Sequence, residues 1–115
     1  MNDTTPTKSI ALVTGARGGI GRQVVAQLRA SGHRVAAVGR DAEALATVSA
    51  DAHIVADSTT PEGAAAAVAA CKGQLGGAPS LLAHCVGSTL IAPLHRSSAA
   101  QIREVLRINL DSALY

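Results

Sequence analysis

The sequence predicts an α/β domain with a doubly wound parallel sheet, because short apolar runs alternate with longer stretches of helical periodicity. Apolar residues make up 48 % of the 115 residues and charged residues 16 %, which is enough apolar material for a packed core. The chain has one Tyr and no Phe or Trp. The core must therefore consist of Val, Ile, Leu and Ala, a composition that suits helices packed closely on a parallel sheet.

Four short apolar runs predict the strands of that sheet. They are Ser9–Thr14, Arg34–Val38, His53–Val55 and Ser80–His84. Because helical stretches separate them, we expect right-handed crossovers between parallel strands. We also expect the spatial order 3-2-1-4, which puts the fourth run at an edge although it carries none of the charges or prolines that protect natural edges.

Apolar spacing and capping residues predict the first two helices. The first is expected over Gly19–Ser31, and Gly32 ends it. Asp41 is an N-cap for a second helix that carries Leu45 and Val48.

The last two helices have stronger start signals. Thr60-Pro61-Glu62 combines an N-cap, a proline at the first helical position and an acid near the positive helix end. That helix is expected to run to Leu75 and to end at Gly76-Gly77. Ser98 and Gln101 form a capping box for a final helix through Val105 and Ile108.

Composition argues against several classes of protein. A net charge of +2 and one aromatic residue do not favour a nucleic-acid partner. Cys71 and Cys85 form no CxxC, so no metal site or disulfide framework is expected, and free thiols fit a reducing compartment. The polar segment 1–8 is expected to be a flexible N-terminus, and the apolar run after it is too short for a signal peptide. No run approaches membrane-spanning length, so a cytoplasmic protein with no membrane partner is expected.

A glycine-rich turn, Thr14-Gly15-Ala16-Arg17-Gly18-Gly19-Ile20-Gly21, follows the first predicted strand. Gly15 lets the chain turn sharply, and Gly19 lets a phosphate approach the backbone. Gly21 lets the next helix pack tightly on the strand. The spacing is neither GxGxxG nor that of a Walker loop. The strand before it and the helix after it nevertheless favour a pyrophosphate site at the helix N-terminus over an ordinary turn.

This TGxxxGxG turn resembles the first βα turn of the short-chain dehydrogenase/reductase family, and the resemblance extends from Ser9 to Tyr115. Gly15, Gly19 and Gly21 match the family's three turn glycines, and Ile20 completes its GIG. The resemblance implies a Rossmann-type sheet over residues 9–115, truncated after the fourth strand and the following helix. It implies an oxidoreductase that moves hydride between a nicotinamide cofactor and a small-molecule carbonyl or alcohol substrate. It also implies a homo-oligomer for the full-length family member.

The end of the second strand favours NADP(H) over NAD(H). An acid there would bind the ribose 2′-hydroxyl, whereas an arginine accommodates a 2′-phosphate. Gly39 stands at the acid position, and Arg40 follows with a planar fork that can pair with phosphate oxygens. Arg17 would add a second positive charge. Two alternatives stay open: both arginines are solvated surface residues, or a one-residue shift brings Asp41 to the ribose.

The third and fourth strands end in further matches to the family. Asp57 matches the Asp that contacts the adenine amino group, the alternative being an Asx-turn before Thr60. The segment His84-Cys85-Val86-Gly87 stands where the family usually has Asn-Asn-Ala-Gly, so only Gly87 is retained. His84 and Cys85 point to opposite faces of a strand, which favours a buried, hydrogen-bonded histidine over a Cys–His pair. The apolar loop 87–94 borders the substrate pocket in the family, or it packs on other parts of the protein.

The resemblance assigns Asn109 to the catalytic machinery, as the Asn that distorts the last helix and holds a water in the proton relay. The alternative is an Asn that is merely unfavourable inside a helix. The family's Tyr-x-x-x-Lys pair, in which the cation lowers the Tyr pKa, does not occur in the 115 residues. Tyr115 lies on the wrong element, and Ser88, Ser97 and Ser98 come too early to be the family serine.

The chain alone is therefore expected to be inactive, as a fragment of a reductase or a natural truncation. The alternatives are a non-catalytic nucleotide-binding module and an inactive truncated remnant.

Overall fold

A computed structural model describes residues 8–115 of the chain. The expected flexible N-terminus, 1–8, lies outside the described residues except for Lys8. The described part contains one parallel four-stranded sheet in the order β3-β2-β1-β4, which confirms the predicted fold class and strand order. The strands are β1 (Ile10–Thr14), β2 (Arg34–Gly39), β3 (Ala52–Val55) and β4 (Leu81–His84).

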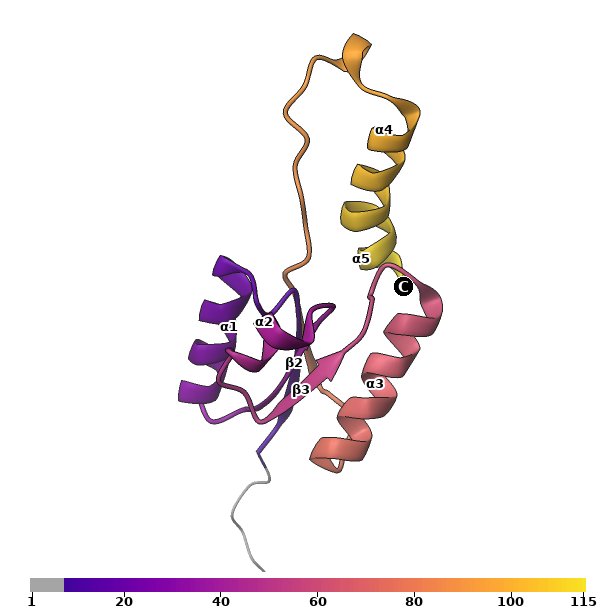
Figure 1. Ribbon diagram of the computed structural model, residues 1–115. Coiled ribbons are helices and arrows are strands. Elements are labelled where there is room, and N and C mark those ends of the chain that lie inside the picture. Colours follow the sequence, from indigo (N-terminus) through magenta and orange to yellow (C-terminus); the bar gives the residue numbers. More distant parts are fainter. Residues whose placement is uncertain (1–7) are drawn as a thin grey trace, which may run out of the picture.

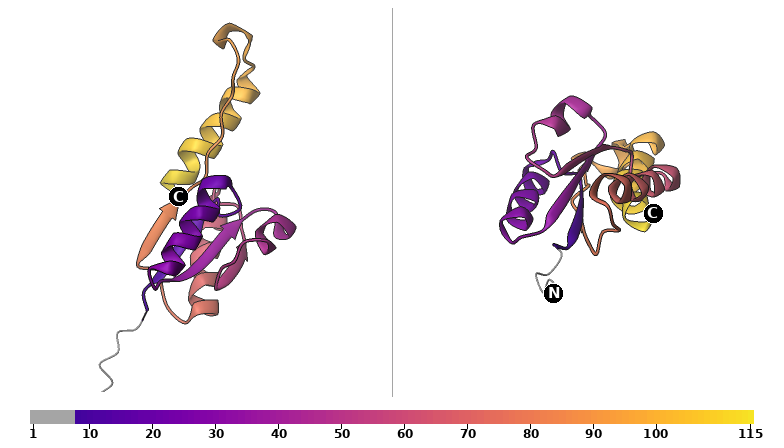
Figure 2. Two further views of the ribbon diagram at one scale, coloured as in Figure 1. Left: turned by 90° about the vertical axis from the view of Figure 1, so that its left-hand side faces the viewer. Right: turned by 90° about the horizontal axis from the view of Figure 1, so that it is seen from below.

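Helices cover both faces of this sheet, so that α1 (Gly19–Ala30) and α2 (Ala42–Ala46) lie on one side and α3 (Pro61–Leu75) lies on the other (Figures 1 and 2). Successive strand residues alternate between the two resulting cores, as the period of two in a strand requires. Leu12 and Val38 pack towards α3, whereas Val13 and Ala37 pack towards α1 and α2. Both faces of the sheet are therefore covered and shielded from solvent. This explains why β1 and β2 are almost continuously apolar.

The predicted caps are present at three helices. Asp41 caps α2, Thr60 caps α3 by accepting from the Gly63 N–H, and Ser98 forms the complete capping box with Gln101. The prediction that the second helix carries Val48 was wrong. Helix α2 ends at Ala46, and Val48 lies beyond its C-cap residue, although its side chain is buried in the same core as Leu45. The apolar period persists there because the turn after the helix keeps packing on the sheet.

The last part of the chain stands out from this body (Figure 1). The loop after β4 leads through a short 3₁₀ turn, η1 (Leu94–Arg96), into α4 (Ala99–Leu106). The helix then widens into a π-helical turn, η2 (Arg107–Asp111), and ends in α5 (Ser112–Leu114). Only the base of this arm meets the body. None of the helices in residues 8–115 is both long and apolar enough to cross a membrane.

Candidate functional site

A cleft of about 400 Å³ opens at the carboxyl ends of the strands. Its walls come from the turn after β1 and from the ends of β2, β3 and β4, with one residue from η2. The lining residues are Gly15, Arg17, Gly18, Val38, Gly39, Arg40, Ala56, Asp57, Ser58, Thr59, Cys85, Val86, Gly87, Ser88 and Ile108. In a doubly wound sheet this end of the strands, where the strand order reverses, is where ligands bind. The two strands that flank the reversal are β1 and β4.

The shape of the glycine turn depends on Gly15 and Gly21. Gly15 has a φ of +62°, and a Cβ on it would lie 2.5 Å from the Cys85 carbonyl oxygen. A Cβ on Gly21 would lie 2.1 Å from the carbonyl oxygen of Gly15. The two glycines therefore let three pieces of backbone meet: the end of β1, the first turn of α1 and the end of β4. Gly21 thus packs against the backbone of the glycine turn, at Gly15 and Ala16, and not only against the strand.

Helix α1 starts at Gly19 and presents a free N-terminal end beside the cleft. Its N-cap residue is Gly18, which has no side chain to accept from the first-turn N–H groups. A Cβ on Gly19 would meet nothing within 4 Å, and the Ile20 side chain is 77 % exposed. Gly19, Ile20 and Gly21 lie at the helix end and not among the residues that line the cleft. Unpaired N–H groups and the positive end of the helix dipole make this position suited to an anion.

Arg17 and Arg40 line the same cleft, one from the glycine turn and one from the end of β2. Gly39 stands directly before Arg40 and leaves that position at the end of β2 without a side chain. Asp41 follows Arg40 and is the N-cap residue of α2. Its Oδ1 accepts from the N–H groups of the second and third residues of α2 at 3.0 and 3.3 Å. Its carboxylate is thus used as a helix cap.

Asp57 lines the cleft from the end of β3, and it also forms the Asx-turn that was its alternative interpretation. Its Oδ1 accepts from the N–H of Thr59 at 2.9 Å and from the Thr59 hydroxyl at 2.6 Å. These two hydrogen bonds lower the pKa of Asp57 below its ordinary value, and the positive charges of Arg107 and Arg40 act in the same direction. Asp57 therefore presents an ionised carboxylate to the cleft at neutral pH.

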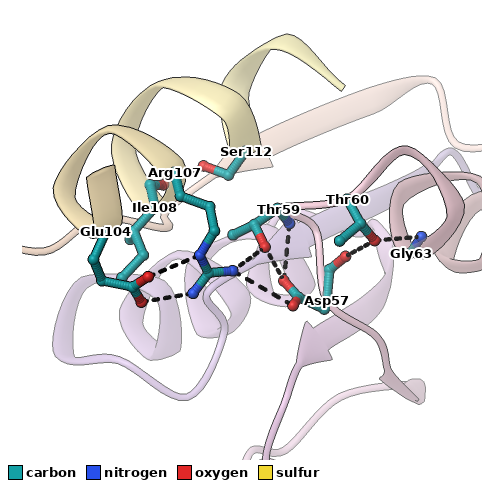
Figure 3. A network of polar contacts seen from close by, with 8 residues as sticks. All are labelled: Asp57, Thr59, Thr60, Gly63, Glu104, Arg107, Ile108 and Ser112. Carbon is teal, nitrogen blue, oxygen red and sulfur yellow. Dashed lines mark hydrogen bonds and ion pairs between the residues drawn. The ribbon is translucent and has the colours of Figure 1, made fainter. Parts of the chain in front are cut away.

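Arg107 is a member of this network that the sequence analysis missed (Figure 3). Its guanidinium pairs in two places with Glu104, at 2.9 and 2.6 Å, and Nη1 also donates to the Thr59 hydroxyl. Nη1 lies 3.7 Å from Oδ2 of Asp57. The spacing of Glu104 and Arg107 on one helix was a visible signal for their pairing. Nothing in the sequence indicates that the pair reaches the end of β3.

Asn109 is placed against the start of the loop after β4. Its Oδ1 accepts from the Ser88 N–H at 3.1 Å, and its Nδ2 donates to the carbonyl oxygens of Ser88 and Val105, each at 2.9 Å. Both amide protons are thus in use. A Cβ on Gly87 would lie 3.2 Å from the Asn109 Oδ1, so the glycine permits this close approach. The local distortion expected of this helix is present as the π-helical turn that contains Asn109.

His84 is hydrogen-bonded on both ring nitrogens, as expected, but it is half-buried and not buried. Nδ1 lies 2.7 Å from the Thr14 hydroxyl, and Nε2 lies 3.1 Å from the Ser112 hydroxyl. Ser112 donates its own proton to the carbonyl oxygen of Ile108, so it must accept from Nε2. Nε2 of His84 therefore carries a proton and donates it to Ser112. This chain of bonds joins β1, β4 and α5.

Cys85 lies apart from the His84 network and lines the cleft. Both cysteines are free, and burial raises the pKa of each thiol, so neither is activated as a nucleophile. Within residues 8–115, no three His, Cys, Asp or Glu side chains gather in a way that would hold a metal ion. The apolar loop contributes to a separate open groove against α4, lined by Leu90, Ala92, Leu94, Ser97, Ile102, Val105 and Leu106.

The sheet order, the two helical layers and the cleft at the strand ends define a Rossmann-type α/β domain. A family model described as short chain dehydrogenase matches residues 9–115. The chain belongs to the short-chain dehydrogenase family. Comparison with curated protein sequences returns no match.

Several solved structures also resemble the chain. A short-chain type dehydrogenase/reductase from Mycobacterium ulcerans has 29 % identity and a TM-score of 0.82, and the match covers 93 % of this chain and 43 % of that one. A variant of actinorhodin polyketide ketoreductase, solved with NADPH, has 25 % identity and a TM-score of 0.85, with 93 % and 44 % covered. A 3-ketoacyl-(acyl-carrier-protein) reductase from Brucella melitensis, solved with NADH, shares the fold at 21 % identity and a TM-score of 0.82, with 92 % and 46 % covered.

The chain therefore spans less than half the length of these solved structures.

Proposed function

We propose that this chain binds NADP(H) as the cofactor-binding part of an oxidoreductase that acts on a carbonyl/alcohol pair. The observation that carries the proposal is the placement of Arg17 and Arg40 in one cleft with the glycine turn. When bound, the nicotinamide would supply or accept the hydride. The residues described here bind and orient the cofactor.

The pyrophosphate is assigned to the N-terminal end of α1. The space beside Gly19 and the lack of a capping side chain at Gly18 support this assignment. Negative oxygens would accept from the first-turn N–H groups, where the helix dipole favours them. Ile20 is an exposed residue at the start of the helix. Gly21 allows the first turn of the helix to pack against the backbone of Gly15.

The 2′-phosphate is assigned to Arg40, with Arg17 as a second cation. Two observations support NADP(H) over NAD(H). Gly39 leaves the strand end without a side chain to bind the ribose 2′-hydroxyl, and the Asp41 carboxylate already caps α2. In the alternative, a ribose hydroxyl would have to bind the Asp41 carboxylate while its Oδ1 caps α2.

The adenine is assigned to Asp57, and the nicotinamide side of the cofactor to the backbone at Gly87 and Ser88. Asn109 is proposed to serve the reaction by holding that backbone in place, because both of its amide protons bind main-chain carbonyl groups. The Oδ1 of Asn109 keeps one lone pair that is available to a water in the proton relay.

Hydride transfer to or from a substrate is proposed only for the whole protein and not for the 115-residue chain. The pair Tyr-x-x-x-Lys is not among the 115 residues, so cofactor binding without turnover is the function proposed for the chain as given. A small carbonyl or alcohol substrate, a homo-oligomer and a cytoplasmic location complete the proposal. The two free thiols are consistent with a reducing compartment.

The choice of cofactor can be tested by substituting Arg40→Ala and titrating NADPH and NADH by calorimetry. NADPH binding should weaken by on the order of 1.5–3 kcal/mol, the value of one charge-assisted contact, while NADH binding should change little. Arg96→Ala is the matched control, because it removes the same charge from η1, outside the residues that line the cleft. Equal losses for both cofactors in Arg40→Ala would contradict NADP(H) preference.

A further inference from the structure

The contact between Arg107 and the β3–α3 loop connects two parts of the chain that lie far apart in sequence (Figure 3). Glu104 fixes the guanidinium plane through two parallel hydrogen bonds, at 2.9 and 2.6 Å. A bidentate pair of this kind restricts the orientation of the arginine side chain more than a single contact would. The guanidinium of Arg107 is therefore oriented by Glu104 before a ligand binds.

The hydrogen bonds beyond Arg107 have a fixed direction. The hydroxyl of Thr59 has one proton, which it donates to Oδ1 of Asp57 at 2.6 Å. Thr59 must therefore accept from Nη1 of Arg107. The chain of donors runs from a cation through the hydroxyl of Thr59, a residue that is 6 % exposed, to a carboxylate. Bonds aligned in this way polarise one another and favour a single arrangement.

This arrangement leaves Asp57 with one oxygen for a ligand. Oδ1 already accepts from the N–H and the hydroxyl of Thr59. Oδ2 accepts no hydrogen bond from any residue in the described part of the chain, and it lies 3.7 Å from Nη1 of Arg107. Because Asp57 lines the cleft and is ionised, Oδ2 is an acceptor that cannot donate.

We propose that Arg107 is a positioning residue for base recognition, which acts through Thr59 to present Oδ2 of Asp57 to a purine that carries a 6-amino group. The proposal rests on the proposed function, since it takes the adenine of the cofactor to lie at Asp57. A 6-amino group donates to Oδ2. A 6-oxo group in the same place would set two acceptors against each other and give Oδ2 no hydrogen bond from that group.

The experiment measures binding of NADPH and of its hypoxanthine analogue to the 115-residue chain and to its variants by calorimetry. The wild-type chain should bind NADPH at least about tenfold more tightly, as one charge-assisted hydrogen bond implies. In Arg107→Ala the preference should fall below about threefold, and Arg107→Lys should restore part of it, because the ammonium can still donate to Thr59. A purely structural role would weaken both ligands alike and leave the ratio unchanged.

Two further variants complete the test. Arg103→Ala, one turn earlier on α4, removes an exposed arginine that forms no side-chain hydrogen bond or ion pair in residues 8–115, so it should keep the wild-type ratio. Thr59→Val interrupts the chain of donors while leaving Arg107 in place, and it should lose the preference as Arg107→Ala does. If Arg107→Ala does not fold, Thr59→Val still tests whether the preference depends on this chain of donors.

The outcomes separate this inference from the proposed function. A wild-type chain that binds NADPH and its analogue equally overturns the inference alone. A preference of about tenfold that survives in folded Arg107→Ala, or in Thr59→Val, also overturns it. A wild-type chain that binds neither dinucleotide overturns the proposed function, and the inference with it.

Discussion

Asn109 binds both main-chain polar groups of Ser88. The Ser88 N–H donates to Oδ1 at 3.1 Å, and the Ser88 carbonyl oxygen accepts from Nδ2 at 2.9 Å. One side chain thus completes the backbone hydrogen bonding at the point where the chain leaves the sheet. The third bond of Asn109, to the Val105 carbonyl oxygen, ties the same amide to the helix. This contact helps to hold η2 of the protruding arm to the start of the loop after β4.

Asn109→Ala should therefore lower the free energy of unfolding by about 1–3 kcal/mol, because several hydrogen bonds of about 1 kcal/mol each are lost at a partly solvated site. Urea unfolding monitored by circular dichroism measures the change. Ser88→Ala is the control, and it should be close to neutral because Asn109 contacts only the main chain of that residue. Equal stability of Asn109→Ala and the wild-type chain would show that the contact does not hold the arm.

Gly21 and Gly73 are both helical glycines, but alanine should have opposite effects at the two positions. A Cβ on Gly21 would lie 2.1 Å from the Gly15 carbonyl oxygen, whereas a Cβ on Gly73 would meet nothing within 4 Å. Gly73→Ala should stabilise by about 0.5–1 kcal/mol through helix propensity. Gly21→Ala should destabilise by roughly 1–3 kcal/mol, since the backbone must shift to accommodate the added atom. Thermal unfolding of both variants checks the signs, and a stabilising Gly21→Ala would refute the packing described here.

Asp57 should make the chain sensitive to acid. Its pKa is lowered in the folded chain, mainly by the two hydrogen bonds from Thr59. The unfolded chain therefore takes up the proton first as pH falls. The stabilisation is complete above the ordinary Asp pKa of about 3.9 and is lost as pH falls through the lower folded value.

Asp57→Asn keeps an Oδ1 acceptor for the turn but cannot ionise. Urea unfolding from about pH 5 to about pH 2.5 should show a steeper loss of stability for the wild-type chain than for this variant. Glu104, whose pKa is also lowered, is present in both proteins and largely cancels in the comparison. Parallel pH profiles would rule out a stabilising role for the Asp57 carboxylate.

Local signals in the sequence were sufficient for most of the fold. Strands β1 and β2 are apolar on both faces, which identifies a sheet covered on two sides, and the capping residues Asp41, Thr60 and Ser98 mark helix starts correctly. Helix α2 was overextended because Val48 continues the apolar period after the helix has ended. The apolar spacing reflects which side chains are buried, and a residue such as Val48 can be buried without belonging to a helix.

The site was harder to predict because its contacts are long-range. Arg107 lies 48 residues from Thr59 in the sequence, and its pairing with Glu104 resembles that of any solvated helix surface. Ser112, the partner of His84, gives no signal at all. The site residues at the strand ends could be predicted from the sequence, because the carboxyl ends of parallel strands meet at one edge of the sheet. It did not identify the helix residues that hold them, because that depends on how the arm returns to the sheet.

Binding of NADP(H) with its pyrophosphate at the glycine turn should change the hydrogen exchange of the backbone amides, which is measured with and without NADPH. Binding should slow exchange in the segment 15–21 and also at Arg40, Asp57 and Gly87. Gly19→Val should fold normally, because a Cβ there meets nothing within 4 Å, yet it should show no protection, because the branched side chain would occupy the approach of the phosphate. An unprotected segment 15–21 in the wild-type chain with NADPH, or equal protection in Gly19→Val, would contradict pyrophosphate binding at the glycine turn.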